Sequence, residues 1–209
     1  MVKWILTGVV ASLSALLAGS ARADVRTGIA AYARGDYPRA MREFEAGAEK
    51  GDPQALYNLG VAYAEGKAVP ADRAKAIDLY RQATAHGSVL AAYNLGQAYR
   101  KGEGVAADFA EATRWYRMAA EGGHYKAAGE LGILYVEGRG VPRDPVEGFA
   151  WIYTGTHASI MDDTALANAV KLAGMLTRDQ VQEGQTRGQA YHKRYIAAHP
   201  AVVRALSGR

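Results

Sequence analysis

Residues 91–126 read AAYNLGQAYRKGEGVAADFAEATRWYRMAAEGGHYK, and the same residue types return when this stretch is shifted by 36 positions in either direction. The positions that recur in register are Leu59-Gly60, Leu95-Gly96 and Leu131-Gly132, then Tyr63, Tyr99 and Tyr135, then Gly66, Gly102 and Gly138, and then Asp72, Asp108 and Asp144. A fixed period of about 20 to 50 residues is typical of solenoids, in which stacked repeats bury one another's apolar faces. The sequence therefore predicts an all-α fold, a right-handed α/α solenoid (superhelix) of helix–turn–helix repeats.

The residue types within one unit indicate where its two helices begin and end. Glycine at Gly66 and its two equivalents favours the left-handed conformation that ends a helix. Asp72 and its equivalents are placed to cap the next helix, and Pro145 suits a first helical position. Gly60 and its equivalents, in contrast, lie inside the first helix, where glycine costs about 1 kcal/mol relative to alanine. We interpret them as sites where the backbone of the paired helix comes close.

Residues 1–23 are predicted to be a signal peptide outside the fold. Lys3 supplies a basic region, residues 4–17 are apolar, and residues 21–23 form an A-x-A cleavage site, so the mature chain is expected to begin at Asp24. A retained membrane anchor is the alternative, but the apolar run is short for a span of about 20 residues. The chain has no cysteine, which excludes a cysteine-linked lipid and disulfides. We expect a periplasmic or secreted protein with no stable membrane insertion after signal cleavage.

The remaining chain is predicted to consist of repeats between two capping segments. The assigned segments are a degenerate N-terminal capping repeat at 24–53, three repeats at 54–89, 90–125 and 126–160, and C-terminal capping helices at 161–209. In the last segment, one helix is expected over residues 164–176. A capping box at Thr177 and Gln180 opens a second helix that reaches about residue 198, and His199-Pro200 marks its end.

The charge distribution argues against a nucleic-acid partner. The formal net charge is +4, and +2 remains once Lys3 and Arg22 are removed with the signal peptide. Residues 171–209 carry +5 and residues 24–170 carry −3, so the repeats lack the basic stripe of a nucleic-acid-binding protein. We interpret the basic C-terminal segment as a solvated helix face, with contact to acidic lipid or glycan as the alternative.

The pattern A-x-x-x-L-G-x-x-Y-x-x-G-x-G-V-x-x-D-x-x-x-A-x-x-W-Y-x-x-A-A-x-x-G, complete in residues 91–123, resembles the Sel-1-like repeat, a relative of the tetratricopeptide repeat. The resemblance covers residues 55–153 well. Ala68 departs from it at the second loop glycine, and Gly148 and Ile152 depart from it in the last copy. The resemblance implies an exported bacterial protein with an all-α superhelix that serves as an adaptor or scaffold for other proteins.

By analogy with tetratricopeptide arrays, the first helix of each repeat is expected to line a concave binding face. The candidate partner-binding residues there are Tyr57, Asn58, Glu65, Tyr93, Asn94, Gln97, Arg100 and Lys101, with Val61, Glu130, Ile133 and Glu137 beside them. Asn58 and Asn94 stand out, because an amide can both donate to and accept from an extended peptide backbone. The alternatives are that each asparagine satisfies its own repeat's loop or a neighbouring helix end, that the tyrosines serve packing, and that the charged residues form a solvated face.

The sequence carries no enzymatic motif. The serines of the mature chain lie in neither G-x-S-x-G nor S-x-x-K contexts, and the histidines form no H-E-x-x-H pair. His86 and His124 are interpreted as loop residues that join repeats. The segment 102–107 fits a nucleotide-binding glycine pattern, but it follows a helix rather than the required strand. We therefore predict no enzymatic activity, no cofactor and no metal site.

These inferences predict a non-enzymatic periplasmic scaffold or adaptor that binds a protein or peptide partner of the cell envelope on its concave face. The alternative is a cell-envelope enzyme or ligand-binding protein that acts on peptidoglycan or β-lactam-like compounds. The resemblance implies such activity for cysteine-rich secreted members of the family, and this chain lacks their cysteines. A third hypothesis is that the face binds another copy of the chain.

Overall fold

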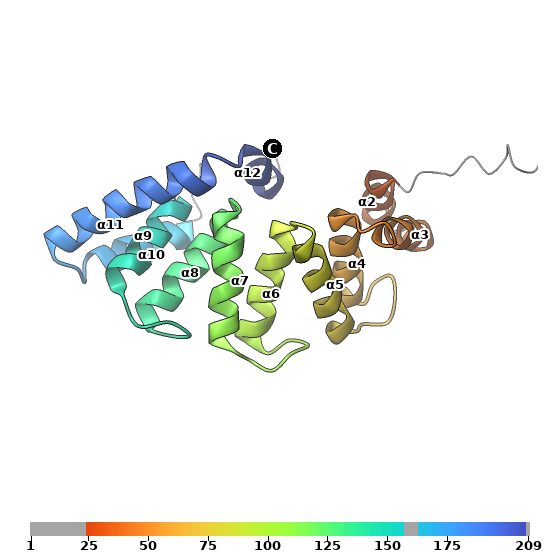
Figure 1. The fold of residues 1–209 in the computed structure, drawn as a ribbon, viewed down its shortest axis with the longest axis horizontal. Helices are drawn as coiled ribbons and strands as arrows, with labels where there is room; N and C mark the ends of the chain where they lie inside the picture. Colours follow the sequence, from red (N-terminus) through yellow and green to blue (C-terminus); the bar gives the residue numbers. More distant parts are fainter. Residues whose placement is uncertain (1–23, 157–162, 208–209) are drawn as a thin grey trace, which may run out of the picture.

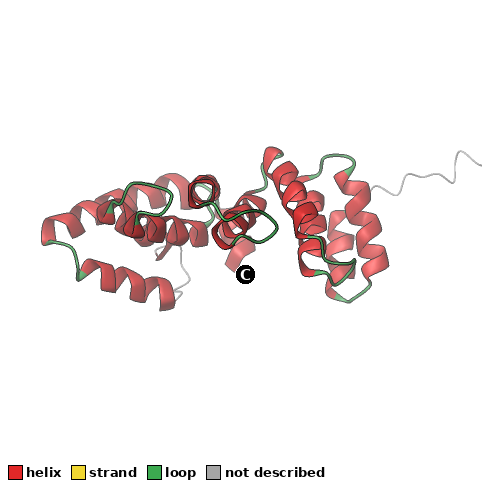
Figure 2. Cartoon of the chain, turned by 90° about the horizontal axis from the view of Figure 1, so that it is seen from below, coloured by secondary structure: helices red, strands yellow, loops and turns green. Residues whose placement is uncertain are grey.

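The computed structural model describes residues 24–156 and 163–207, so the predicted signal peptide lies outside the described residues. Within these ranges the regular elements are all helices joined by loops (Figure 2). The repeat region consists of α2 (Val25–Ala33), α3 (Tyr37–Ala48), α4 (Pro53–Glu65), α5 (Arg73–Ala85), α6 (Val89–Lys101), α7 (Phe109–Glu121), α8 (Tyr125–Glu137) and α9 (Pro145–Thr156). The helices pair and stack into a curved array (Figure 1), which confirms the predicted all-α solenoid.

The helix ends lie where the repeated glycines and aspartates predict them. Gly66, Gly102 and Gly138 have left-handed φ angles of 68°, 76° and 71° at the C-caps of α4, α6 and α8. Asp108 accepts hydrogen bonds from the backbone N–H groups two and three residues further on, at 2.8 and 3.1 Å, and so caps α7. The equivalent aspartates cap α5 and α9, and α9 begins at Pro145 as predicted.

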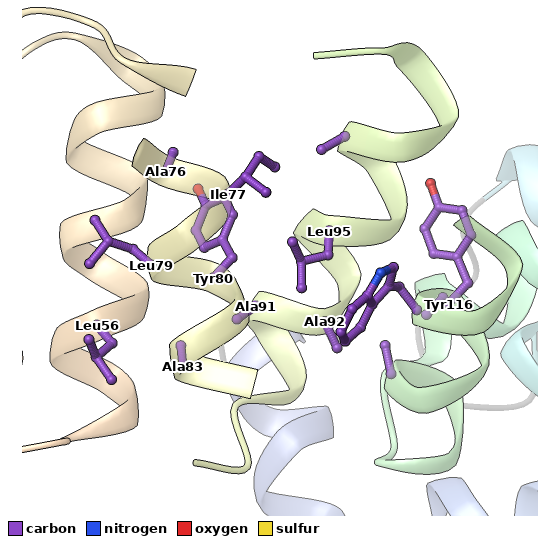
Figure 3. Close-up of a cluster of buried hydrophobic side chains, with 14 of the residues drawn as sticks. Leu56, Ala76, Ile77, Leu79, Tyr80, Ala83, Ala91, Ala92, Leu95 and Tyr116 are labelled. Carbon is purple, nitrogen blue, oxygen red and sulfur yellow. The ribbon is translucent and has the colours of Figure 1, made fainter. Parts of the chain in front are cut away.

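The glycines inside α4 and α6 make room mainly for an aromatic ring. The predicted approach of a backbone is wrong for Gly96, and at Gly60 the Ala76 carbonyl oxygen, 3.4 Å from an added Cβ atom, is a more distant neighbour than the ring. A Cβ atom on Gly60 would lie 2.6 Å from the Tyr80 ring, and one on Gly96 would lie 2.6 Å from the Tyr116 ring. Figure 3 shows the two rings in equivalent places in successive repeats, on α5 and α7. Each ring is buried, and it leaves no space for a side chain on the facing glycine.

In the third repeat the backbone does come close, as predicted. A Cβ atom on Gly132 would lie 2.6 Å from the carbonyl oxygen of Gly148 and 2.6 Å from Ile152 Cγ1. Ile152 stands where the earlier copies have tyrosine, and Gly148 stands where they have alanine. Because both replacements are smaller, α9 can pack directly on the backbone of α8.

The first unit, α2 and α3, uses the same packing with a shorter loop. A Cβ atom on Gly28 would lie 2.7 Å from the Phe44 ring. Phe44 keeps the 36-residue offset from Tyr80, whereas Gly28 precedes Gly60 by 32 positions. The four missing residues therefore belong to the loop, and positions in α2 correspond to positions 32 residues later in α4.

Loops of later repeats lie against the preceding unit. Gly104 has a φ of 79°, and a Cβ atom on it would lie 2.7 Å from the Arg73 carbonyl oxygen at the start of α5. Gly140 lies in the same way against Phe109 at the start of α7. Ala68 stands at the equivalent position in the loop between α4 and α5, and the unit before that loop is the shortened one, α2 and α3. The second loop glycine thus serves the contact between repeats.

The C-terminal helices lie on the last repeat and then return along the array (Figure 1). They are α10 (Asp163–Ala173), α11 (Arg178–Tyr191), the π-helical turn η1 (His192–Ile196) and α12 (Pro200–Ser207). The capping box at Thr177 and Gln180 is present, as predicted. Pro200 does more than end a helix, because it also begins α12, consistent with the preference of proline for the first helical turn.

Two glycines allow α11 to approach α9 closely. A Cβ atom on Gly184 would lie 2.6 Å from the Phe149 ring, and one on Gly188 would lie 2.8 Å from the Ala150 carbonyl oxygen. These contacts bury the face of α9 that no further repeat covers.

Glu147 of α9 joins the same two helices through hydrogen bonds. Its carboxylate accepts from Trp151 Nε1 at 2.8 Å, from Arg187 Nη1 at 3.0 Å and from the Tyr191 hydroxyl at 3.0 Å. The Tyr191 ring also stacks on Trp151, with ring centroids 4.6 Å apart. Burial, together with the negative charge of Glu147, raises the pKa of Tyr191 to about 12.

Candidate partner-binding face

The eight predicted binding residues all lie on α4 and α6, the first helices of successive repeats. The two tyrosines among them are half-buried and pack inward. The ring of Tyr57 lies against Tyr80, with centroids 6.0 Å apart, and the ring of Tyr93 lies against Tyr116, with centroids 5.8 Å apart. Both tyrosines therefore make packing contacts with the second helix of their own repeat.

The two asparagines occupy equivalent positions but have different partners. The Asn58 amide donates to the Gln54 carbonyl oxygen at 2.6 Å, one turn earlier in its own helix. The Asn94 side chain lies close enough to the phenols of Tyr57 and Tyr80 in the preceding repeat to influence both of them. Burial raises the pKa of both phenols, and the interaction with the Asn94 amide opposes this shift. Asn94 thus connects two repeats, whereas Asn58 does not.

The charged candidates are partly paired within the chain. Glu65 accepts a hydrogen bond from the Tyr32 hydroxyl at 2.9 Å. Burial and this bond raise the pKa of Tyr32 to about 12. Arg100 Nη1 lies 3.7 Å from Glu130 Oε2 on α8. Lys101, at the end of α6, is exposed to solvent.

A pocket of about 200 Å³ opens between α4 and α6, and α5 contributes its third wall. It is lined by Ala64, Arg73, Ala76, Ile77, Tyr80, Asn94, Gln97, Ala98 and Glu103. Asn94 and Gln97 were predicted from the sequence as binding residues, and the structure brings these two together. The walls from α4 and α5 were not predicted, because nothing in the local pattern distinguishes Ala64 from a core alanine.

His124 is a buried helix cap, whereas the sequence interpretation treated it as a loop residue. Its Nδ1 accepts from the Ala127 N–H at 3.2 Å, and its ring stacks on Tyr93 with centroids 4.1 Å apart. The residue is 1% exposed, and this burial lowers its pKa to about 3. Asp52 and Ser88 cap α4 and α6 at the two positions equivalent to His124. The 36-residue spacing of these N-caps is the sequence signal that could have identified His124 as a helix cap.

The face offers hydrogen-bonding groups rather than a reactive centre. Ser88 serves as the N-cap of α6 and accepts from the Ala91 N–H at 3.3 Å. Over residues 24–156 and 163–207, no group of three His, Cys, Asp or Glu residues is placed to hold a metal ion. In the same part of the chain, no helix has both the length and the apolarity needed to cross a membrane. The polar groups that line the pocket are the amides of Asn94 and Gln97, the Tyr80 hydroxyl and the charged Arg73 and Glu103.

Comparison with known proteins adds a family and two structural neighbours. The Sel1 repeat family matches residues 53–88, 89–124 and 126–153. A protective antigen of uropathogenic Escherichia coli strains that displays an SLR fold is 33% identical to the chain, with a TM-score of 0.71 over 81% of this chain and 36% of the antigen. A Sel1 repeat protein from Oxalobacter formigenes is 28% identical, with a TM-score of 0.69 over 84% of this chain and 75% of that protein. No curated protein matches the chain significantly.

The chain spans little more than a third of the antigen's length. Sel1 repeat proteins generally act as scaffolds for protein–protein interactions and are typically not enzymes. The three matched repeats, together with the shared solenoid fold, show that this chain belongs to the Sel1 repeat family.

Proposed function

We propose that the chain is a non-enzymatic adaptor of the bacterial periplasm that binds a segment of another protein on the concave face of its array. The location rests on the predicted signal peptide at residues 1–23. The observation that carries the proposal is the pocket between α4 and α6, which contains the amides of Asn94 and Gln97.

The surroundings of the pocket support a polypeptide as the ligand. Tyr80, Ile77 and three alanines give the pocket apolar walls, and Arg73, Asn94, Gln97 and Glu103 add charged and hydrogen-bonding groups. The exposed Glu65 and Lys101 lie at the ends of α4 and α6. Protein–protein interfaces likewise combine apolar contacts with hydrogen-bonding groups. In this proposal Tyr57, Asn58, Tyr93 and Arg100 shape the face, and the neighbouring exposed side chains contact the partner.

The experiment is affinity capture with residues 24–209 from a crosslinked envelope extract. The test variant combines Gln97→Ala with Lys101→Glu, which changes α6 without touching a core residue. The control combines Gln82→Ala with Arg42→Glu, which also removes one amide and reverses one positive charge, at exposed positions of α5 and α3.

A protein that is retained by the parent and the control but lost by the test variant supports the proposal. Equal retention by all three forms moves the binding site away from α6, for example to the basic C-terminal helices. Capture of no specific protein contradicts the adaptor function itself.

A further inference from the structure

We propose that the pocket between α4 and α6 receives a tyrosine side chain of the partner polypeptide. The inference rests on the proposed function and adds the chemistry by which a partner is selected. It comes from a comparison of this junction between repeats with the junctions on either side.

The pocket is open because a small residue, Ala64, stands where the flanking junctions have large ones. Counted from the mid-helix glycine, Ala64 of α4 corresponds to Tyr32 of α2 and to Arg100 of α6. If these side chains occupy equivalent space, they should contact the equivalents of the residues that line the pocket.

Tyr32 meets this expectation. Its ring centroid lies 5.2 Å from that of Tyr37 and 6.2 Å from that of Phe44. At the 36-residue offset, Tyr37 and Phe44 correspond to Arg73 and Tyr80, which both line the pocket. A tyrosine of the chain itself therefore fills this space at the first junction.

Arg100 meets the expectation at the following junction. Its guanidinium lies 3.7 Å from Glu130 and is close enough to Tyr116 to interact with the phenol electrostatically. Glu130 and Tyr116 correspond to Asn94 and Tyr80, again two residues of the pocket. Since both flanking junctions are filled from within the chain, the open junction between them has the shape for a side chain supplied from outside.

The size and the interior of the pocket fit a phenol. A cavity of about 150 Å³ holds benzene, so the 200 Å³ found here accommodates a phenol ring between the methyl groups of Ala64, Ala76 and Ala98. The Asn94 amide and the Tyr80 hydroxyl both line the pocket, so the Asn94 carbonyl oxygen is available as an acceptor and the Tyr80 O–H as a donor. A guest hydroxyl can donate to the first group and accept from the second.

Arginine and phenylalanine fit less well. At the junction of Arg100 the cation faces a carboxylate, Glu130, whereas the pocket has the neutral Asn94 in that place. The charged residues of the pocket wall are Arg73 and Glu103. A guest guanidinium would therefore meet a like charge as well as a carboxylate, so the pocket offers it less compensation for the solvation that it loses. Phenylalanine would leave the Asn94 carbonyl oxygen without a donor.

The direct test is NMR titration of the isotope-labelled chain with N-acetyl-tyrosinamide. We expect saturable shifts of the side-chain amide signals of Asn94 and Gln97. N-acetyl-phenylalaninamide should bind about two- to tenfold more weakly, since it lacks one hydrogen-bonding group, and N-acetyl-argininamide should bind more weakly still. Unmoved amide signals, or an arginine derivative that binds as tightly as the tyrosine derivative, would overturn the proposal.

Two variants close the pocket with side chains that the array already uses. Ala64→Arg with Asn94→Glu copies the pair formed by Arg100 and Glu130, and Ala64→Tyr copies Tyr32. Both should keep the helical circular dichroism spectrum and abolish the shift at Gln97. Ala110→Arg, at an exposed position of α7, adds the same bulk elsewhere and should leave binding unchanged.

The outcomes separate this inference from the proposed function. If the closed-pocket variants no longer bind N-acetyl-tyrosinamide but still capture the partner protein from the extract, the adaptor function stands and the proposal that the pocket receives a tyrosine of the partner is wrong. If tyrosine binds but no protein is captured, the pocket chemistry stands and the adaptor function is wrong.

Discussion

Mild acid should destabilise the array through one buried imidazole, that of His124. The ring is 1% exposed, stacks on Tyr93 and accepts the Ala127 N–H through Nδ1. Protonation would place an unpaired charge in this apolar site and would also remove the acceptor of the helix cap. Burial, reinforced by the nearby Lys126 charge, therefore lowers the pKa of His124 from 6.5 to about 3.

The size of the effect follows from the two pKa values. In the unfolded chain the imidazole takes up a proton below its ordinary pKa of 6.5, whereas in the folded chain it stays neutral down to about 3. Unfolding is thus accompanied by proton uptake between these values, so the free energy of unfolding falls as the pH is lowered through this window. At about 1.4 kcal/mol per pH unit, lowering the pH from about 7.5 to about 5 should remove about 2 kcal/mol.

The assay is urea unfolding followed by far-UV circular dichroism at both pH values. His124→Ser is the matched control, because Ser88 already serves as the cap at the equivalent position and serine does not titrate. The variant should be less stable at neutral pH, since it loses the stack on Tyr93, but it should lose about 2 kcal/mol less than the parent on acidification. Equal losses in the two proteins would refute this account of His124.

Two further predictions concern packing, and both are checked by urea unfolding. Gly96→Ala should lower the free energy of unfolding by about 1 to 3 kcal/mol, because the new Cβ atom meets the Tyr116 ring. Gly132→Ala should lower it further, because the new Cβ atom there meets the carbonyl oxygen of Gly148, which belongs to the backbone. The reverse order would contradict the assignment of ring and backbone contacts. Glu147→Gln should lower the free energy of unfolding by about 1 to 2 kcal/mol and speed amide hydrogen exchange in α11. Unchanged exchange would show that the contacts of Gly184 and Gly188 alone hold this helix on α9.

The solenoid could be predicted from the sequence because its determinants are local. Gly66 ends a helix for a reason contained in its own φ angle, and Asp108 begins one through N–H groups within three residues. The partner of Gly96 could not be predicted from the local sequence, because a glycine leaves room for an aromatic ring and for a backbone equally well. Only the position of Tyr116, 20 residues later and on another helix, decides between them.

The binding face was less predictable because its properties arise between repeats. Asn58 and Asn94 are the same residue at the same position of the unit, yet Asn58 bonds within its own helix, whereas Asn94 interacts with the phenols of two tyrosines of the preceding repeat. Asn58 follows the shortened unit, which has Phe44 in place of a tyrosine and therefore no hydroxyl for the amide. The partner of each asparagine is thus set by the unit before it.

This dependence on neighbours suggests where a repeat array can acquire specificity without losing its fold. The mid-helix glycine and the aspartate are kept in every unit of this chain, since each unit needs its close packing and its cap. Position 64 and its equivalents point into the junction, where Tyr32, Ala64 and Arg100 are all compatible with the same helix pairing. We infer that a single change from a large residue to alanine there opens a pocket while the helices stay in place. We therefore expect the residues that depart from the repeat at its junctions, rather than those that define it, to determine what the proposed binding face accepts.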